Sequence, residues 1–180
     1  MMRFAALLRG VNVGKARRLP MAELRTLLAR MGYTEVATLL NSGNVVFSAA
    51  KGTPALHAAA IAAAVARDLG VDVPVVVKSA SELAGIVDGN PLAVGAFDPS
   101  CLLVAYVQDE KSLSGLAAVA RLVERPERFV IGKKAAYLHC ANGILGSKAG
   151  EALLGKAGTT ATTRNWSTTL KLNALANRDA

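Results

Sequence analysis

Few residues of this chain carry the side chains that metal sites and disulfides need. The 180 residues include two cysteines and two histidines, and no Cys/His group has the spacing of a zinc site. The sequence therefore predicts neither a metal nor a cofactor. Cys101 and Cys140 both lie in apolar, strand-like stretches, which favours reduced core thiols over a disulfide.

Long apolar runs and aromatic side chains are also scarce. The apolar run at residues 1–9 is too short for a secretory signal, and the Ala-rich run at 55–66 contains His57 and is too short to span a bilayer. We therefore expect a cytoplasmic protein with no membrane partner. One Trp, three Tyr and four Phe leave Ala, Val and Leu to build most of the core, and a hydrophobic content of 52% argues against disorder.

Acidic residues are few at both ends of the chain. Residues 1–50 and residues 133–180 each hold seven Lys/Arg and two Asp/Glu, whereas residues 51–132 hold seven and nine. Two basic ends that meet would attract an anionic partner. On charge alone, a solvated basic surface is the favoured interpretation.

The order of the expected elements repeats along the chain. Residues 1–78 follow the order strand, helix, strand, strand, helix, strand, which is the split βαβ pattern of ferredoxin-like domains. Residues 79–100 form a helix and a linker, and residues 101–180 restart the order less regularly and end in a helix. The predicted fold class is α/β, of the α+β sandwich type, with tandem ferredoxin-like β-α-β-β-α-β halves.

The loop after the first strand is basic. Five of its residues are candidates for contact with an anion: Arg9, Asn12, Lys15, Arg17 and Arg18. It resembles a phosphate loop only loosely, because the Gly14-Lys15 pair lacks the upstream Gly and the following Ser/Thr of a Walker motif. Anion contact and an exposed loop made basic for solubility explain these residues equally well.

The turn Asn41-Ser42-Gly43-Asn44 separates two strands of an expected hairpin. Gly and Asn tolerate positive φ, so a tight turn alone explains these four residues, and we favour that interpretation. If the turn folds beside the basic loop, its side chains would add hydrogen bonds to a ligand.

Residues 135–150 combine a strand, a glycine-containing loop and a helix start. The strand ends at His139 and Cys140, the loop contains Asn142 and Gly143, and Ser147 is the expected cap of the next helix, beside Lys148. Such a loop favours an anion through its N–H groups and the helix dipole. The spacing also approaches that of a phosphatase loop, with Cys140 as the nucleophile. Gly146 stands where that chemistry needs an Arg, and Lys148 lacks the planar fork of an Arg.

The stretch Thr162–Thr168 contains the single Trp of the chain at an expected helix start. We favour a packing role for Trp166, because its large side chain suits anchoring of a terminal helix. Arg164 and Asn165 remain candidates for a binding site.

Four motifs together resemble the domain-of-unknown-function 1697 family. They are Ala6-Leu-Leu-Arg-Gly-Val-Asn-Val-Gly, Asn41-Ser-Gly-Asn-Val-Val-Phe, Tyr137-Leu-His-Cys-Ala-Asn-Gly and Thr163-Arg-Asn-Trp. The resemblance runs from end to end and implies a two-part α/β fold with ferredoxin-like halves, but no reaction. Because the motifs fall on the polar loops described above, it also implies that these loops share a cleft.

We therefore expect an anion-binding protein with a basic cleft between its two halves and a phosphate-bearing small molecule as ligand. The alternatives are an enzyme of phosphoryl or nucleotide chemistry that uses His139 or Cys140, and, ranked third, an RNA-binding protein with exposed aromatics on its sheets. The sequence leaves oligomeric state and enzymatic activity open. The expected ligand-binding residues are Arg9, Asn12, Lys15, Asn41, Ser42, Asn44, His139, Asn142, Gly143, Ser147, Lys148, Arg164 and Asn165.

Overall fold

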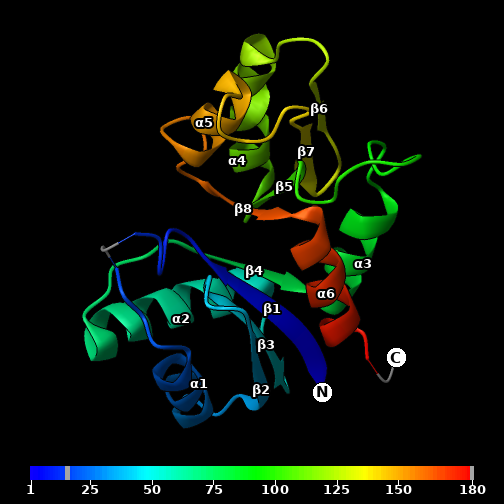
Figure 1. The fold of residues 1–180 in the computed structure, drawn as a ribbon. Coiled ribbons are helices and arrows are strands. Elements are labelled where there is room, and N and C mark those ends of the chain that lie inside the picture. Colours follow the sequence, from blue (N-terminus) through cyan, green and yellow to red (C-terminus); the bar gives the residue numbers. More distant parts are fainter. Residues whose placement is uncertain (15–16, 179–180) are drawn as a thin grey trace. The chain divides into compact units, whose positions relative to one another are not determined.

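The computed structural model describes residues 1–14 and 17–178 and divides into two compact units. Unit 1 comprises Met1–Leu83 and the C-terminal residues from Leu172 onward, and unit 2 comprises Ala84–Lys171. Each unit contains one four-stranded antiparallel sheet (Figure 1). The structure therefore has the mixed α and β composition that the sequence predicts.

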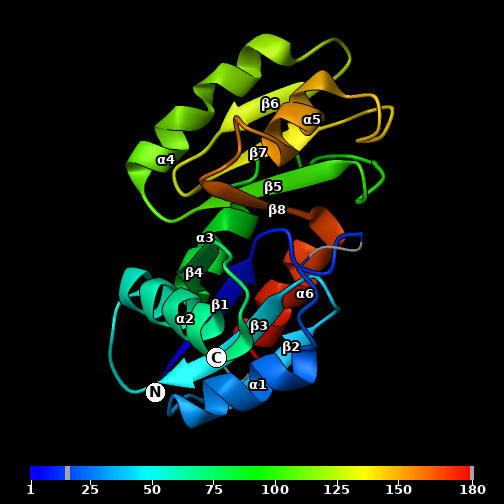
Figure 2. The same ribbon diagram turned by 90° about the vertical axis from the view of Figure 1, so that its left-hand side faces the viewer.

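The sheet of unit 1 has the strand order β2-β3-β1-β4, and all neighbouring strands are antiparallel. Its strands are β1 (Met2–Leu8), β2 (Thr34–Leu39), β3 (Asn44–Ala49) and β4 (Val75–Ser79). Helix α1 (Met21–Arg30) connects β1 to β2, and α2 (Pro54–Leu69) connects β3 to β4 (Figure 2).

The helices of unit 1 form where apolar residues recur at helical spacing between clear start and stop signals. Leu24, Leu27 and Leu28 of α1 are buried against the sheet in one core cluster with Ile61 of α2. At the start of α2, the Thr53 side chain accepts a hydrogen bond from the Leu56 N–H, and Gly70 ends the helix at a left-handed φ of 66°.

A buried histidine lies among the aromatic residues of this core. The ring of His57 contacts Phe4, Phe47 and Tyr33, and the Tyr33 hydroxyl lies 2.9 Å from His57 Nδ1. His57 Nε2 is buried without a hydrogen-bond partner among the described residues. Burial lowers the pKa of His57, and a backbone hydrogen bond with Lys51 raises it by a smaller amount. The neutral ring is therefore the favoured form.

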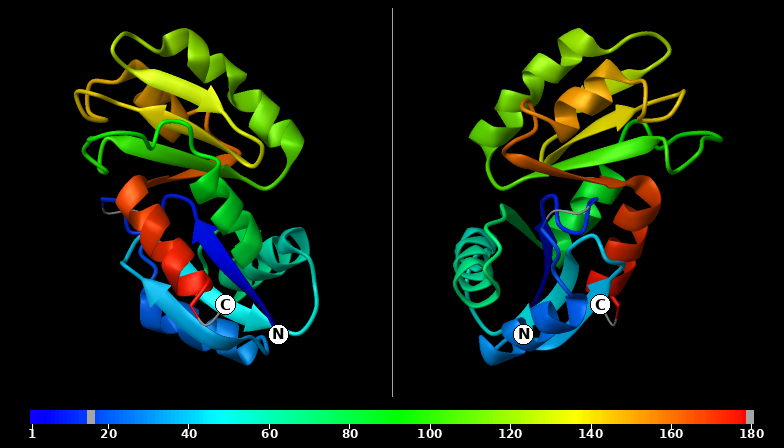
Figure 3. Two further views of the ribbon diagram at one scale, coloured as in Figure 1. Left: turned by 90° about the vertical axis from the view of Figure 1, so that its right-hand side faces the viewer. Right: turned by 60° about the vertical axis from the view of Figure 1, so that its left-hand side comes forward.

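The sheet of unit 2 has the strand order β6-β7-β5-β8 and repeats the antiparallel pairing of unit 1. Its strands are β5 (Leu102–Val107), β6 (Arg128–Ile131), β7 (Ala135–His139) and β8 (Ala161–Asn165). Helix α4 (Glu110–Gly115), the 3-10 helix η1 (Leu116–Leu122) and α5 (Lys148–Leu154) lie on one face of this sheet (Figure 3).

Two helices, α3 (Ala80–Asp88) and α6 (Trp166–Ala176), cross the boundary between the units along the chain. The start of α3 forms a capping box: Ser79 N–H donates to Glu82 Oε2, and Glu82 N–H donates to Ser79 Oγ. Asn165 caps α6, accepting a hydrogen bond from Thr168 N–H.

The structure departs from the sequence expectations at two places. The single helix that the repeated element order places between the first two strands of the second half is split into α4 and the tighter η1, with the change at Gly115. The C-terminal residues from Leu172 group with unit 1 rather than with the second half, because the Arg3 guanidinium donates hydrogen bonds to the Leu175 and Arg178 carbonyls at 3.3 and 3.1 Å.

Within the described ranges, no helix is both long and apolar enough to cross a membrane. The same ranges contain no group of three His, Cys, Asp or Glu residues placed to hold a metal ion.

Candidate functional site

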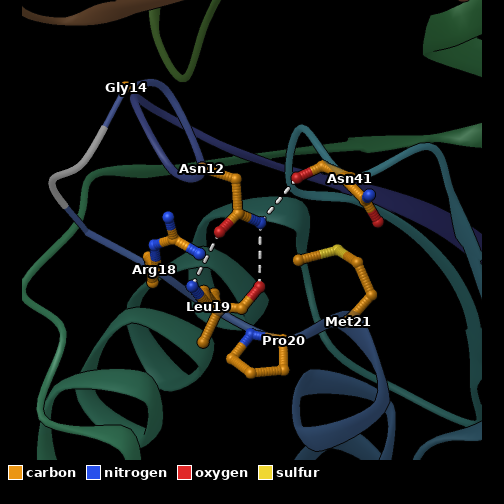
Figure 4. Close-up of a pocket in the computed structure, with 7 residues that line it drawn as sticks. All are labelled: Asn12, Gly14, Arg18, Leu19, Pro20, Met21 and Asn41. Carbon is orange, nitrogen blue, oxygen red and sulfur yellow. Dashed lines mark hydrogen bonds between the residues drawn. The ribbon is translucent and has the colours of Figure 1, made fainter.

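Asn12 ties the basic loop of unit 1 to itself and to the neighbouring turn. It has a left-handed φ of 56°, and its Oδ1 accepts a 2.8 Å hydrogen bond from Leu19 N–H. Its Nδ2 donates to the carbonyls of Leu19 at 2.8 Å and Asn41 at 2.6 Å (Figure 4). Both amide hydrogens are thus used, so Asn12 shapes the loop rather than offering a donor to a ligand.

The turn at Asn41–Asn44 packs directly against the basic loop. Leu8 N–H donates to the Gly43 carbonyl at 2.8 Å, and a Cβ placed on Gly43 would lie 2.5 Å from Val11 Cγ2. Asn44 is buried, and its Nδ2 donates to the Leu39 carbonyl and to Ser42 Oγ. The turn therefore lies beside the loop, with Ser42 and Asn44 holding its shape.

The loop and the turn border an open pocket of about 390 Å³ at the start of α1. It is lined by Asn12, Gly14, Arg18, Leu19, Pro20, Met21 and Asn41 (Figure 4). Pro20 is the N-cap of α1, and no side chain of the described residues makes a capping hydrogen bond there. The first backbone N–H groups of α1 thus point toward the pocket end of the helix without a capping acceptor.

Arg18 is the charged residue among the described residues that line this pocket, and two further arginines, Arg9 and Arg17, belong to the same basic loop. Burial lowers the pKa of Arg9, and the neighbouring positive charge of Arg17 lowers it further. The Arg17 guanidinium reaches back to Gly10, where an added Cβ would lie 3.6 Å from Nη1. Lys15, another expected contact, lies outside the described residues.

The loop before α5 in unit 2 uses its polar groups internally. Ser147 is buried, and its Oγ accepts a 2.9 Å hydrogen bond from Gly150 N–H, which makes it the predicted helix cap. Cys140 is fully buried in the core of unit 2, and burial raises the pKa of its thiol. A buried thiol with a raised pKa is a poor nucleophile, so the geometry gives no support to phosphatase chemistry.

Beside that loop is a small pocket of about 110 Å³, lined in part by Asn142, Gly143 and Lys148. Lys148 Nζ lies 2.6 Å from Glu124 Oε1, and this hydrogen bond raises the pKa of Lys148. An anion at this pocket would meet the Glu124 carboxylate as well as the lysine.

The remaining expected residues of unit 2 have structural partners. The half-buried Arg164 donates to Thr162 Oγ1 at 2.8 Å and the Thr163 carbonyl at 2.7 Å, and desolvation of its guanidinium lowers its pKa to about 10. Asn165 caps α6, and the His139 ring lies edge-on to Phe97 at 6.3 Å.

The aromatic residues on which RNA binding would depend are largely inside the units. Phe4 and Phe47 belong to the core of unit 1, and the hydroxyls of Tyr106 and Tyr137 are hydrogen-bonded to Thr169 and to the Ile86 carbonyl. Their ring faces are thus buried rather than presented for base stacking.

The structure brings Asn12 and Asn41 together at one pocket of unit 1 and Asn142, Gly143 and Lys148 together at another pocket of unit 2. The apolar wall of the first pocket, Leu19 to Met21, was missed by the sequence analysis. The sequence contained a signal for this wall, because Pro20 indicates where the basic loop ends and α1 begins. One cleft shared by all these residues stays a prediction.

Comparisons with known proteins agree with this fold. A conserved bacterial protein from Streptococcus pneumoniae has a similar structure, with a TM-score of 0.78 and 22% sequence identity over 98% of this chain and 99% of that chain. The comparison with curated proteins found no match. Residues 1–137 match the family model described as "Protein of unknown function (DUF1697)", and the chain belongs to this family.

Proposed function

We propose that this protein binds a small phosphate-bearing anion in the pocket of unit 1. The observation that carries the proposal is the position of Arg18, whose side chain lines a pocket of about 390 Å³ beside the uncapped start of α1. A guanidinium and helix N–H groups are both strong donors to phosphate oxygens.

The start of α1 adds to the attraction for an anion. Leu24 N–H donates to the Pro20 carbonyl at 3.1 Å, so the N–H groups of Met21, Ala22 and Glu23 precede the first intrahelical hydrogen bond. The helix dipole places partial positive charge at the same end. Glu23 lies in this first turn, and its exposed carboxylate reduces the attraction in part.

Two other arginines of the basic loop add to its positive charge. Arg9 and Arg17 are close enough for the charge of Arg17 to lower the pKa of Arg9. This positive charge favours the approach of an anion to the loop.

The experiment is calorimetric titration of the protein with inorganic phosphate at low ionic strength. Removal of Arg18 in Arg18→Ala should weaken phosphate binding by about 10- to 150-fold, since loss of a charged hydrogen bond costs about 1.5–3 kcal/mol. The matched control is Arg30→Ala, which removes an exposed arginine from the opposite end of the same helix. Absence of binding by the unmodified protein, or equal losses in the two variants, would reject the proposal.

We further propose that each unit is a ferredoxin-like domain and that the protein acts in the cytoplasm. The β-α-β-β-α-β element order and the equivalent strand orders of the two antiparallel sheets support the first point. The free state of Cys101 and Cys140 supports the second.

A further inference from the structure

The pocket of unit 1 has two chemically different walls. Arg18 lines it from the basic loop, whereas Leu19, Pro20 and Met21 line it where that loop enters α1 (Figure 4). Leu19 and Met21 are 1% and 9% exposed, so their side chains form a packed wall rather than a mobile fringe.

The size of the pocket exceeds what a bare phosphate fills. Phosphate has five non-hydrogen atoms, whereas cavities of about 300–1,000 Å³ are typical sites for organic ligands. At about 390 Å³, the pocket has room for an organic group beside the anion. Asn12 donates both hydrogens of its amide to the Leu19 and Asn41 carbonyls, so it has no hydrogen-bond donor left for this organic group.

We infer that the unit 1 pocket takes the phosphate monoester of an aromatic group, with the phosphate at Arg18 and the ring against Pro20 and Met21. The inference rests on the proposed function and names the class of its ligand. A thioether makes favourable contacts with the edge of an aromatic ring, and a proline presents a flat apolar surface. Against the side chains of Leu19, Pro20 and Met21, a polyhydroxylated organic group would lose hydration without gaining hydrogen bonds from them.

The test compares three anions by calorimetric titration: inorganic phosphate, glycerol 3-phosphate and phenyl phosphate. The two esters carry the same kind of phosphate and differ in the organic group. We expect phenyl phosphate to bind about tenfold more tightly than either of the others. In Met21→Ser this preference should largely disappear, and in the matched variant Met21→Leu, which keeps an apolar side chain, most of it should remain.

The outcomes separate the inference from the function beneath it. If phosphate binds but phenyl phosphate binds no more tightly than glycerol 3-phosphate, the aromatic ligand class is wrong and anion binding stands. If none of the three binds, the proposed function itself fails. If Met21→Ser keeps the full preference for phenyl phosphate, the ring does not lie against Met21. The comparison of the three anions on the unmodified protein remains a test even if Met21→Ser does not fold.

Discussion

Unit 1 and unit 2 have equivalent strand orders, yet they enter their first helix in opposite ways. In unit 1 twelve residues separate β1 from α1, and the helix begins at Pro20 without a side-chain cap among the described residues. In unit 2 two residues separate β5 from α4, and Asp109 accepts a 2.7 Å hydrogen bond from Ser112 N–H. The carboxylate of Asp109 thus occupies the position at which an external anion would bind.

This difference shows how one topology yields a pocket beside an uncapped helix start in one unit and a capped helix start in the other. The N–H hydrogen bonds to Asp109 lower its pKa, which keeps the internal anion charged. Unit 1 instead holds arginines near an open helix start. Strand order therefore carries no information about the ligand, whereas loop length and the capping residue do.

The largest expected effect comes from filling the contact between turn and loop in unit 1. In Gly43→Ala the new Cβ would meet Val11 Cγ2 at 2.5 Å and Leu8 Cβ at 2.9 Å, at a φ of 75° that disfavours alanine. We expect the free energy of unfolding to fall by about 2–4 kcal/mol in chemical denaturation.

The control for this prediction lies in the loop of unit 2. Gly143 also has a positive φ, 86°, but nothing lies within 4 Å of an added Cβ. Gly143→Ala should therefore show only the cost of the backbone conformation, about 1–2 kcal/mol. Equal losses in the two variants would mean that the packing of turn on loop adds no stability.

Exchanging the two helix starts tests the comparison directly. Pro20→Asp gives α1 the kind of cap that Asp109 gives α4, and we expect phosphate affinity to fall more than tenfold while stability changes little. The new cap adds about 1 kcal/mol, and loss of the proline removes about 0.4–1 kcal/mol. Calorimetric titration and denaturation measure the two quantities on the same sample.

The reverse change is Asp109→Ala in unit 2. It should destabilise the protein by about 1 kcal/mol through loss of the cap on α4. It should create no phosphate binding, because unit 2 lacks the long arginine-rich loop at this helix start. Phosphate binding gained in Asp109→Ala would contradict the importance of that loop.

A smaller effect is expected from His57, the buried histidine of unit 1. The folded protein holds its pKa below the ordinary 6.5, so the unfolded chain takes up a proton first as pH falls. The contribution of His57 to the free energy of unfolding should therefore be constant above pH 6.5. It should decrease as the pH falls below 6.5 and level off once the ring of the folded protein is protonated. Tyr33 is the titratable group that faces the ring, and it stays neutral throughout this range.

Carboxylates do not obscure this measurement at mildly acidic pH. Four carboxylates have pKa values below the ordinary 4.5 of Glu and 3.8 of Asp: Glu35, Asp68, Asp98 and Asp109. The stabilisation that each contributes is therefore lost mainly as the pH falls below these ordinary pKa values. In His57→Gln the slope of stability against pH between about 6.5 and 5.5, above the range in which the carboxylates contribute, should flatten. If the slope is unchanged in His57→Gln, the pH dependence of stability comes from another titratable group.

Most of the fold was predictable from the sequence because its signals are local. The element order of residues 1–78 indicated the strands and helices of unit 1, Ser147 marked the start of α5, and the turn at Asn41–Asn44 marked a hairpin. The split at Gly115 was not predictable, because packing rather than periodicity decides between an α-helix and a 3-10 helix there.

The candidate site was only partly predictable, since it depends on contacts between distant residues. The sequence singled out Asn12 and Asn41 but gave no reason for the hydrogen bond between them, which spans 29 positions. It also grouped Ser147, Arg164 and Asn165 with the ligand, whereas their described partners are backbone and hydroxyl groups of their own unit. A polar residue in a loop satisfies the fold and a ligand with the same atoms, and the sequence does not distinguish the two.

The smallest effect is expected at Lys148, whose removal asks whether unit 2 takes part in anion binding. Lys148 and Glu124 form an ion pair with side chains 68% and 65% exposed, and solvent screens such pairs strongly. Lys148→Ala should change the free energy of unfolding by less than about 0.5 kcal/mol and leave phosphate affinity unchanged. If phosphate affinity falls as far as in Arg18→Ala, the loop before α5 contributes to binding and the contrast between the two units is wrong. If Lys148→Ala binds phosphate normally while Arg18→Ala does not, the basic loop of unit 1 accounts for the affinity by itself.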